Sequence, residues 1–388
     1  MDIFEKDQTY VASTYGRSPV ALVSGKGALL RDVNGKEYID LGSGIAVNTF
    51  GAADDEWVSA VTAQLNSLQH ISNLYYTSPC AQLAEMLCQR TGMKKVFFSN
   101  SGAEANECAI KAARRYACLK HGDMEHSRII TLKNSFHGRT ITTLAATGQD
   151  SFHTDFGPFP EGFAYASPTD ASEIRALAAN GDCTAVMMEM IQGEGGVYPL
   201  EPDFVNEVVS IAREYDLLII VDEVQTGNGR TGRLYAYMDY GFQPDIVTTA
   251  KGIGGGLPIG VTMLGEKVKD VFTPGTHGST FGGNPVACAG AVSILSRLDD
   301  ALLADVRAKH EYIVSELSGA KGVKGIYGKG LMLGIETDKP AKEVIAQCMD
   351  KGVLVLSAKT RVRLLPPLNI DMELLKKAIA VLKDVLAC

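Results

Sequence analysis

The stretch LIIVDEVQTGNGRTG, residues 218–232, joins a short apolar run to two carboxylates and then to a glycine-rich segment. Similar apolar runs, each of a length that suits a buried strand, lie at 94–100, 128–134, 184–191 and 245–251. Helical patterns stand between them, at 103–122 and 201–216. Because near-continuous apolar strands alternate with helices, the sequence predicts an α/β fold with a mostly parallel central sheet covered on both faces.

The two ends of the chain have a different pattern. The segment GALLRDVNGKEYIDLGSG (27–44) has a strand pattern on either side of Asn34-Gly35, which predicts a β-hairpin. From about residue 290 onward, helical patterns alternate with short strands. We therefore predict a large domain at 51–285 and a smaller α+β domain built from both chain ends, residues 1–50 and 286–388.

Composition and charge narrow the class of protein. The chain has 388 residues and a formal net charge of −8, which argues against nucleic acid as the main partner. Its apolar runs are far too short to span a bilayer, and the start MDIFEKDQTY does not resemble a secretory signal, so we expect a cytoplasmic protein without a membrane partner. The cysteines form no C-x-x-C pair and the histidines show no metal-ligand spacing, which favours reduced thiols and gives a metal site little support.

The glycine-rich part of the opening stretch, residues 227–232, spells G-x-G-x-x-G directly after a strand pattern. With Asp245 near the spacing of a ribose-binding acid, it offers one alternative, a nicotinamide-dependent oxidoreductase. However, such a loop needs a helix at its last glycines, whereas RLYAYMDYGFQPD is short, aromatic and closed by Gly and Pro. A pyrophosphate would also face Asp222 and Glu223 without a helix dipole. We interpret the glycines as a flexible connection that turns the chain away from the site.

Two strand ends carry charged side chains. Asp222 ends the run LLIIV, where a buried carboxylate needs a partner, and a structural ion pair with Arg230 or Arg233 is as good an explanation as function. Lys251 ends DIVTTA and precedes a glycine-rich loop. Its amine could form a Schiff base once burial and a neighbouring cation lower its pKa. The alternative is a lysine that reaches the surface.

Three further segments offer groups for a ligand. In SNSGAEAN (99–106), Ser101 and Glu104 predict a capping box, and the N–H groups of Ser101, Gly102 and Ala103 could hold a phosphate, although a plain capped helix is the better explanation of this motif taken alone. SFHGRT (135–140) supplies an aromatic ring and an arginine that could bind a carboxylate. HGSTFGGN (277–284) suits an anion or another subunit. Together with Asp222 and Lys251, these groups predict a site for pyridoxal 5′-phosphate (PLP).

The sequence resembles class III (subgroup II) PLP-dependent aminotransferases, which have fold type I. The most specific match is VDEVQTGNGRTG followed by PDIVTTAKGIGGGLPIG. The likeness extends to SNSGAEANE, SFHGRT, IQGEGG, HGSTFGGNP and RLLPPL, and it covers nearly the whole chain from about Tyr10. The resemblance implies the fold, the cofactor PLP and an aminotransferase activity.

The resemblance also implies roles at the matching positions. Lys251 would form the Schiff base, Asp222 would pair with the pyridine nitrogen, and Gln225 would hydrogen-bond the ring hydroxyl. The other implied contacts are Ser101, Gly102 and Ala103 at the phosphate, Val224 and Phe136 on the two ring faces, Thr280 at the phosphate of the partner subunit, and Arg139 with Ser279 at the α-carboxylate of the amino donor. The shared phosphate site implies a homodimer.

One implied pair concerns the choice of substrate. Arg363 would bind the α-carboxylate of 2-oxoglutarate and glutamate, while Glu194 would pair with Arg363 in one half-reaction and release it in the other. When Arg363 is masked, a distal amine can enter while Arg139 holds the far carboxylate. Tyr15 would lie near the substrate.

The implied reaction moves an ω-amino group. The segments STYGRSPVALVSGKG and SNLYYTSP are most similar to those of enzymes that act on N2-acetyl-L-ornithine, with 2-oxoglutarate as acceptor, in arginine biosynthesis. Succinyldiaminopimelate, ornithine, succinylornithine and 4-aminobutyrate stay open as donors, since one or two contacts can decide between them. A relative that keeps the fold only for binding is a further alternative, which nothing in the sequence favours.

Overall fold

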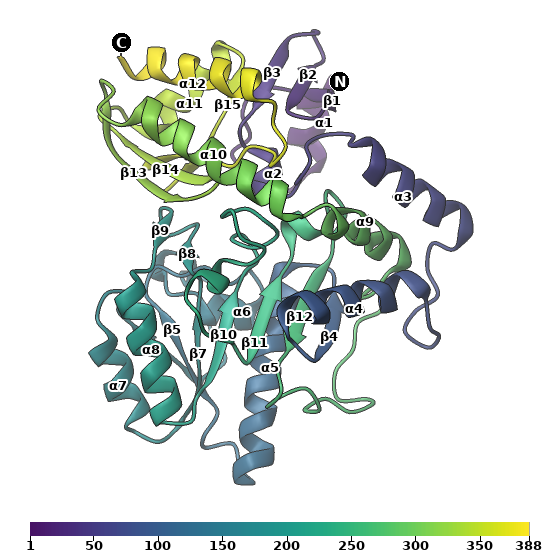
Figure 1. The fold of residues 1–388 in the computed structure, drawn as a ribbon, viewed down its shortest axis with the longest axis vertical. Helices are drawn as coiled ribbons and strands as arrows, with labels where there is room; N and C mark the ends of the chain where they lie inside the picture. The colour runs from purple at the N-terminus through teal and green to yellow at the C-terminus, as the bar shows by residue number, and fades with distance from the viewer. Residues whose placement is uncertain (388) are drawn as a thin grey trace.

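The computed structural model describes residues 1–387, and a seven-stranded sheet with helices on both faces forms its larger part (Figure 1). In spatial order the strands are β4 (Lys95–Ser99), β12 (Gly260–Leu264), β11 (Ile246–Thr249), β10 (Leu218–Asp222), β7 (Cys183–Met188), β5 (Arg128–Leu132) and β6 (Phe163–Ala166). The pairs are parallel except those of β12, which is antiparallel to both of its neighbours. The predicted α/β fold with a mostly parallel sheet is confirmed.

The central strands are mostly apolar because their alternate side chains enter two separate cores. Along β10, Leu218 and Ile220 pack in the core under α5 (Gly102–His121). Ile219 and Val221 pack on the opposite face, in the core that contains α7 (Ala171–Ala178) and α8 (Pro202–Glu214). Since successive side chains of a strand point to opposite faces, burial on both sides requires a continuous apolar run.

The sequence patterns located most of these elements. The helical patterns at 103–122 and 201–216 correspond to α5 and α8. The apolar run at 184–191 extends beyond the strand that it predicted, because β7 ends at Met188 and the chain then turns. The next strand, β8 (Ile191–Gln192), pairs with β9 (Tyr198–Pro199). The patterns did not predict β6 and β12.

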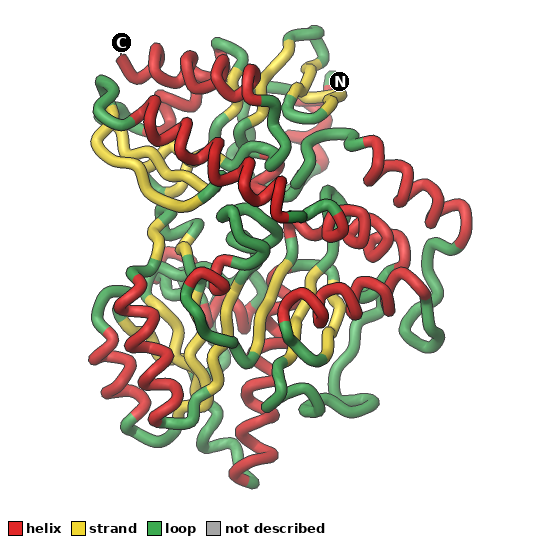
Figure 2. The backbone as a smooth tube through the Cα atoms, viewed as in Figure 1, coloured by secondary structure: helices red, strands yellow, loops and turns green. Residues whose placement is uncertain are grey.

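Both chain ends meet in the smaller part of the molecule (Figure 2). The predicted hairpin is present: β2 (Leu29–Asp32) pairs antiparallel with β3 (Glu37–Asp40), and β3 pairs in parallel with β15 (Val353–Leu354) near the other end of the chain. Strand β1 (Leu22–Lys26) completes this sheet, and a second sheet has the order β13 (Val323–Lys329), β14 (Met332–Thr337), β17 (Arg361–Leu364) and β16 (Leu356–Ala358). The domain boundaries at residues 50 and 285 stay a prediction.

The remaining helices cover the sheets and connect them. They are α1 (Ile3–Tyr10), α2 (Ser43–Ala46), α3 (Asp55–Ser67), α4 (Ser78–Thr91), α6 (Ile141–Ala146), α9 (Pro285–Ser296), α10 (Asp300–Leu317), α11 (Ala341–Asp350) and α12 (Met372–Ala387), with short 3₁₀ turns at Asp150–Phe152, Ala236–Asp239 and Lys251–Ile253. Within residues 1–387, no helix is both long and apolar enough to cross a membrane.

The glycine-rich segment 227–232 is a buried turn, so its interpretation as a flexible connection was wrong. Its residues are buried, and no helix begins at its last glycine. Gly229 and Gly232 have positive φ, and a side chain at Gly229 would collide with Leu298 and Leu368 from the smaller part. The glycines therefore let the chain turn tightly beneath the second sheet and α10. A pyrophosphate could not reach this buried turn.

Candidate active site

A cavity of about 450 Å³ opens at the carboxyl ends of the central strands. In open α/β sheets, ligands bind outside this edge. The predicted site residues that line the cavity are Ser101, Gly102, Ala103, Phe136, Arg139, Glu194, Asp222, Val224, Gln225 and Lys251. They come from segments up to 150 residues apart (101 to 251), so the sheet brings distant motifs to one place.

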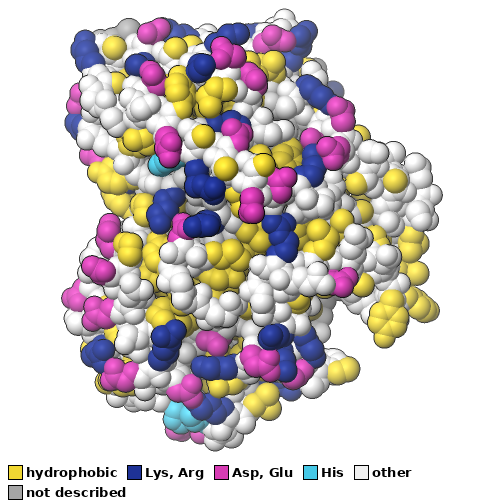
Figure 3. Space-filling model, in the orientation of Figure 1, with side chains coloured by type: hydrophobic (Ala, Val, Ile, Leu, Met, Phe, Trp, Pro, Cys, Tyr) yellow, Lys and Arg dark blue, Asp and Glu magenta, His cyan; other side chains and the backbone are white. Residues whose placement is uncertain are grey.

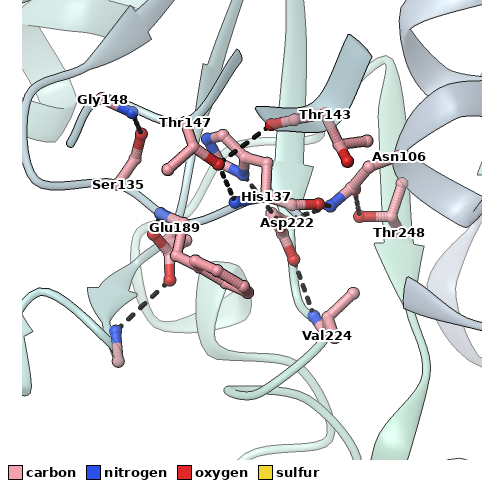
Figure 4. A network of polar contacts seen from close by, with 12 residues as sticks. Asn106, Ser135, His137, Thr143, Thr147, Gly148, Glu189, Asp222, Val224 and Thr248 are labelled. Carbon is pink, nitrogen blue, oxygen red and sulfur yellow. Dashed lines mark hydrogen bonds and ion pairs between the residues drawn. The ribbon is translucent and has the colours of Figure 1, made fainter. Parts of the chain in front are cut away.

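Asp222 lies at the end of β10 in a network of hydrogen bonds (Figure 4). Its Oδ2 accepts a hydrogen bond from Asn106 Nδ2 at 2.7 Å and lies 2.8 Å from His137 Nδ1. Its Oδ1 accepts one from the backbone N–H of Val224 at 3.0 Å. Thr248 Oγ1 donates to Asn106 Oδ1 at 2.7 Å, which fixes the orientation of the amide. The carboxylate is thus held rigidly, and the network contains no arginine.

The alternative that Asp222 forms a structural ion pair with Arg230 or Arg233 is therefore wrong. Arg230 is buried and donates to the backbone oxygens of Leu331 and Pro366. Arg233 pairs instead with Asp239 at 2.6 Å. The chain after β10 gives both arginines partners outside the cavity: Arg230 contacts the smaller part of the molecule, and Arg233 pairs with the nearby Asp239.

Lys251 follows β11 in a left-handed conformation, with φ +47°. That conformation is uncommon for a residue other than glycine and is often found at functional sites. Burial lowers the pKa of the Lys251 ammonium, and although Asp222 and Glu194 oppose the shift, the pKa stays below its ordinary value. The amine therefore loses its proton more readily than an exposed lysine, as a nucleophile or proton carrier requires.

The first turn of α5 faces the cavity. Ser101 is the N-cap, and its Oγ accepts a hydrogen bond from the N–H of Glu104. The predicted capping box is displaced by one residue, because the Glu104 carboxylate accepts from the N–H of Asn100 and not from that of Ser101. A Cβ at Gly102 would lie 2.6 Å from Val224 Cγ1, so only glycine lets this turn approach so closely. N–H groups at a helix N-terminus favour a phosphate.

The two arginines that are predicted to bind carboxylates have different surroundings. The Arg139 guanidinium is exposed and lies over the rings of Phe152 (4.4 Å) and Phe136 (5.7 Å). Arg363 is buried behind Glu194, and its Nη1 donates to Glu194 Oε1 at 2.6 Å and to Gln225 Oε1 at 3.2 Å. Burial would raise the pKa of Glu194, but Arg363, together with Lys251 and Gln225, lowers the pKa below its ordinary value. Glu194 is therefore ionised and closes access to Arg363.

Three other predicted residues lie outside the cavity. Tyr15 is exposed and lines a separate groove of about 870 Å³ beside α1. Ser279 Oγ accepts a hydrogen bond from the N–H of Gly282, and Thr280 is exposed next to it. Within one chain, these three side chains are not part of the site.

Sequence reasoning missed four polar residues that line the cavity: Asn100, Asn106, His137 and Glu189. Asn106 and His137 stand inside quoted motifs, yet only their contacts with Asp222 identify them. Glu189 accepts hydrogen bonds from the N–H groups of Phe136 and Gly193, and burial, with Asp222 nearby, raises its pKa well above the ordinary value. A single acid in the apolar run 184–191 was the signal that could have found it.

Glu223 faces away from the cavity and has a structural environment. Its carboxylate is fully buried and accepts hydrogen bonds from Thr226 Oγ1 and the N–H of Tyr237. Burial raises its pKa from 4.5 to about 7, so the folded protein holds this proton more tightly than the unfolded chain does. The free energy of unfolding therefore falls as the pH rises from about 4.5 through about 7.

Glu223→Gln should remove this pH dependence, because glutamine is neutral at every pH. We expect the variant to gain stability over the wild type, from under about 1 kcal/mol at pH 5 to about 3 kcal/mol at pH 8. Thermal unfolding of both proteins across this pH range measures the gain, with Glu207→Gln, an exposed position of α8, as control. A difference that stays constant from pH 5 to pH 8 would contradict the assignment.

Comparison with known proteins gives a consistent result. The family described as Aminotransferase class-III matches residues 10–386. Acetylornithine aminotransferase of Haemophilus ducreyi is 48% identical over 387 residues, which cover 99% of this chain and 98% of that protein. Among solved structures, N-acetylornithine aminotransferase of Stenotrophomonas maltophilia has a TM-score of 0.83 at 34% identity and covers 99% of this chain and 98% of that one. Ornithine aminotransferase of Toxoplasma gondii, with PLP at its active site, has a TM-score of 0.94 at 32% identity, covering 99% and 93%. The chain belongs to the class-III aminotransferases.

Proposed function

We propose that the protein transfers the δ-amino group of N2-acetyl-L-ornithine to 2-oxoglutarate, giving N-acetyl-L-glutamate 5-semialdehyde and L-glutamate in arginine biosynthesis. The observation that carries this proposal is the closed pair of Glu194 and Arg363, beside Lys251 in a cavity that also contains Arg139. A masked Arg363 favours a donor whose reacting amine is far from its α-carboxylate. The similarity to acetylornithine aminotransferases supports the same donor.

The cavity residues fit PLP, the cofactor of this family. Asp222 would hold the pyridine nitrogen in its protonated form, Gln225 would bind the ring hydroxyl, and the first turn of α5 would bind the phosphate. Phe136 and Val224 would lie against the ring. When bound, PLP supplies a ring that withdraws electrons from the carbon next to the transferred nitrogen.

Lys251 would move the proton in this site. Its amine lies among Asp222, Glu194 and Glu189, and its lowered pKa favours the neutral form that can accept a proton from the substrate carbon. The rigid network of Asn106, His137 and Asp222 fixes the floor of the cavity. A preorganised carboxylate of this kind stabilises positive charge without having to reorient.

Arg139 and Arg363 would bind substrate carboxylates in turn. In the first half-reaction, Arg139 would hold the α-carboxylate of acetylornithine while Glu194 covers Arg363. In the second, a dicarboxylate such as 2-oxoglutarate would displace Glu194 and pair with Arg363. A guanidinium binds a carboxylate with two parallel hydrogen bonds, which orients the substrate as well as holding it.

Glu194→Ala tests this exchange directly. The variant should raise kcat/KM for glutamate relative to that for acetylornithine by about tenfold, if Arg363 is free in roughly a tenth of wild-type molecules. Steady-state or single half-reaction kinetics with both amino donors measures the ratio. An unchanged ratio would count against the exchange of Glu194 for a substrate carboxylate.

The assembly that we propose is a cytoplasmic homodimer in which Thr280 reaches the phosphate site of the partner subunit, while Ser279 lies close to the donor α-carboxylate that Arg139 binds. Exposed apolar side chains support a subunit contact here. The loop between α3 and α4 exposes Leu74, Tyr75 and Tyr76. Figure 3 shows hydrophobic side chains on the part of the surface that this loop forms. Phe281 is also exposed and packs against His70 of the same loop. Exposed patches of this kind usually mark an interface. Tyr15 is proposed to lie near the substrate once the dimer has formed.

A panel of amino donors tests the proposed function. The purified protein should react fastest, by kcat/KM, with N2-acetyl-L-ornithine when compared with ornithine, succinylornithine, succinyldiaminopimelate and 4-aminobutyrate. A preference for another of these donors would overturn the named substrate and leave the ω-aminotransferase class intact. An absorption band in the near-visible range that shifts when an amine is added checks the cofactor independently of turnover.

A further inference from the structure

Strand β17 carries two buried arginines, Arg361 and Arg363, two residues apart and therefore on one face of the strand. Arg363 pairs with Glu194. Arg361 reaches the same loop two residues further on, where its Nη1 donates to the backbone oxygen of Gly196 at 2.7 Å. One strand therefore holds the loop that carries Glu194 at two points.

The contacts of Arg361 fix its guanidinium closely. It lies over the rings of Tyr327, at 3.3 Å from the centroid, and Tyr198, at 3.8 Å. Its ion pair with Glu336 is longer, at 3.5 Å, and involves a carboxylate that is partly exposed, so this pair contributes little. The guanidinium contacts both rings, which are inclined at 60° to each other, while it donates to the carbonyl oxygen of Gly196.

The loop segment that Arg361 holds is strained. Val197 is fully buried and has φ +57°, a conformation that β-branched residues rarely adopt. Its side chain fits only because positions 328 and 334 are glycines: a Cβ at Gly334 would lie 2.9 Å from Val197 Cβ, and one at Gly328 would lie 3.1 Å from Val197 Cγ1. The side chain of Val197 therefore packs against strands β13 and β14, and Arg361 hydrogen-bonds the peptide group that precedes Val197.

Glu194 lies between two anchored points of the loop. On one side, the N–H of Gly193 donates to the buried Glu189 carboxylate at 3.3 Å. On the other side, Gly196 is held by Arg361. A strained conformation persists only when its surroundings enforce it, so the loop should relax when one anchor is removed.

We infer that Arg361 is a positioning residue that fixes the 193–197 loop so that Glu194 stays paired with Arg363, and that it thereby sets how readily a second carboxylate gains access to Arg363. This inference rests on the proposed function. It goes beyond the Glu194–Arg363 pair itself, because it assigns the balance between the two amino donors to a residue that touches neither substrate.

The test measures the binding of glutarate, a dicarboxylate that cannot be transaminated, to the PLP-loaded protein by calorimetry. Arg361→Met, which keeps an unbranched side chain of the length of the aliphatic stem and removes the hydrogen-bond donors, should tighten glutarate binding by about fivefold, a typical size for coupling between sites. Loss of the positive charge of Arg361 would by itself weaken the binding of an anion. Tighter binding therefore indicates a loosened Glu194 loop, and weaker binding indicates the lost charge. Arg175→Met, at an exposed ion pair on α7, is the matched control and should leave the affinity unchanged.

A second background shows whether Arg361 acts through Glu194. In Glu194→Gln, which no longer neutralises Arg363, Arg361→Met should have no further effect on glutarate binding. If Arg361→Met weakens binding in both backgrounds, Arg361 merely supports β17 and the inference is overturned. An affinity that does not change in the wild-type background overturns it as well. If the wild-type protein does not bind glutarate at all, the proposed function fails, and this inference fails with it.

Discussion

Lys251→Ala should reduce kcat by about 10⁴-fold or more, because the variant loses both the amine that bonds to the cofactor and the group that carries the proton. The amine lies in the cavity at the end of β11, and burial lowers its pKa. No other lysine lines this cavity within residues 1–387 and could take over its role. Steady-state kinetics with acetylornithine and 2-oxoglutarate measures the loss.

The backbone conformation at position 251 means that Lys251→Ala should have little effect on stability. Alanine is as strained as lysine at φ +47°, so the exchange should leave the midpoint temperature of unfolding nearly unchanged. Lys359 provides a matched control: it is also left-handed, with φ +51°, but it is exposed and bonds to Asn134 outside the cavity. Lys359→Ala should keep its activity. Retention of more than about a hundredth of the wild-type kcat by Lys251→Ala would remove Lys251 from the mechanism.

The sheet could be predicted because burial on both faces leaves a strong local signal. Runs such as 217–221 are apolar at every position, and they correspond to central strands. Strand β12 was missed because it begins at Gly260, at the end of the glycine-rich segment GIGGGLPIG, where the strand pattern is hard to separate from the loop. Its antiparallel direction depends on pairing with β4 and β11, which no local pattern contains.

The site could be predicted as a set of motifs, whereas its internal contacts could not. Parallel strands end at one edge, so residues that follow them, such as Lys251 and Asp222, were expected to meet there. The partners of Asp222 are Asn106 from α5 and His137 from the loop after β5, and only the folded structure brings these side chains together. The alternative of an ion pair between Asp222 and Arg230 or Arg233 is wrong, because these arginines have other partners beyond the buried turn at 227–232.

The second substitution with a large expected effect on kcat is at Asp222, one of the two adjacent acids at the end of β10. Asp222→Asn should reduce kcat by about 10³-fold, since a neutral amide cannot stabilise a protonated pyridine nitrogen as a preorganised carboxylate does. The change is nearly isosteric, and Asn106 can still donate to the side-chain oxygen. The pKa of the Lys251 ammonium should fall further, because Asp222 is the group that raises it most. Kinetics over a pH range and a titration with PLP measure both consequences.

Glu223→Gln is the matched control, because it makes the same chemical change one residue along the chain. Glu223 is as deeply buried as Asp222, but its hydrogen bonds go to Thr226 and Tyr237, away from the cavity. We expect Glu223→Gln to stay within about twofold of the wild-type kcat, as is usual for a position that touches no reacting group. Equal losses in the two variants would mean that general damage to the end of β10 explains both. A loss in Asp222→Asn alone assigns the chemistry to the carboxylate that faces the cavity, because strand position, burial and the type of substitution are otherwise shared.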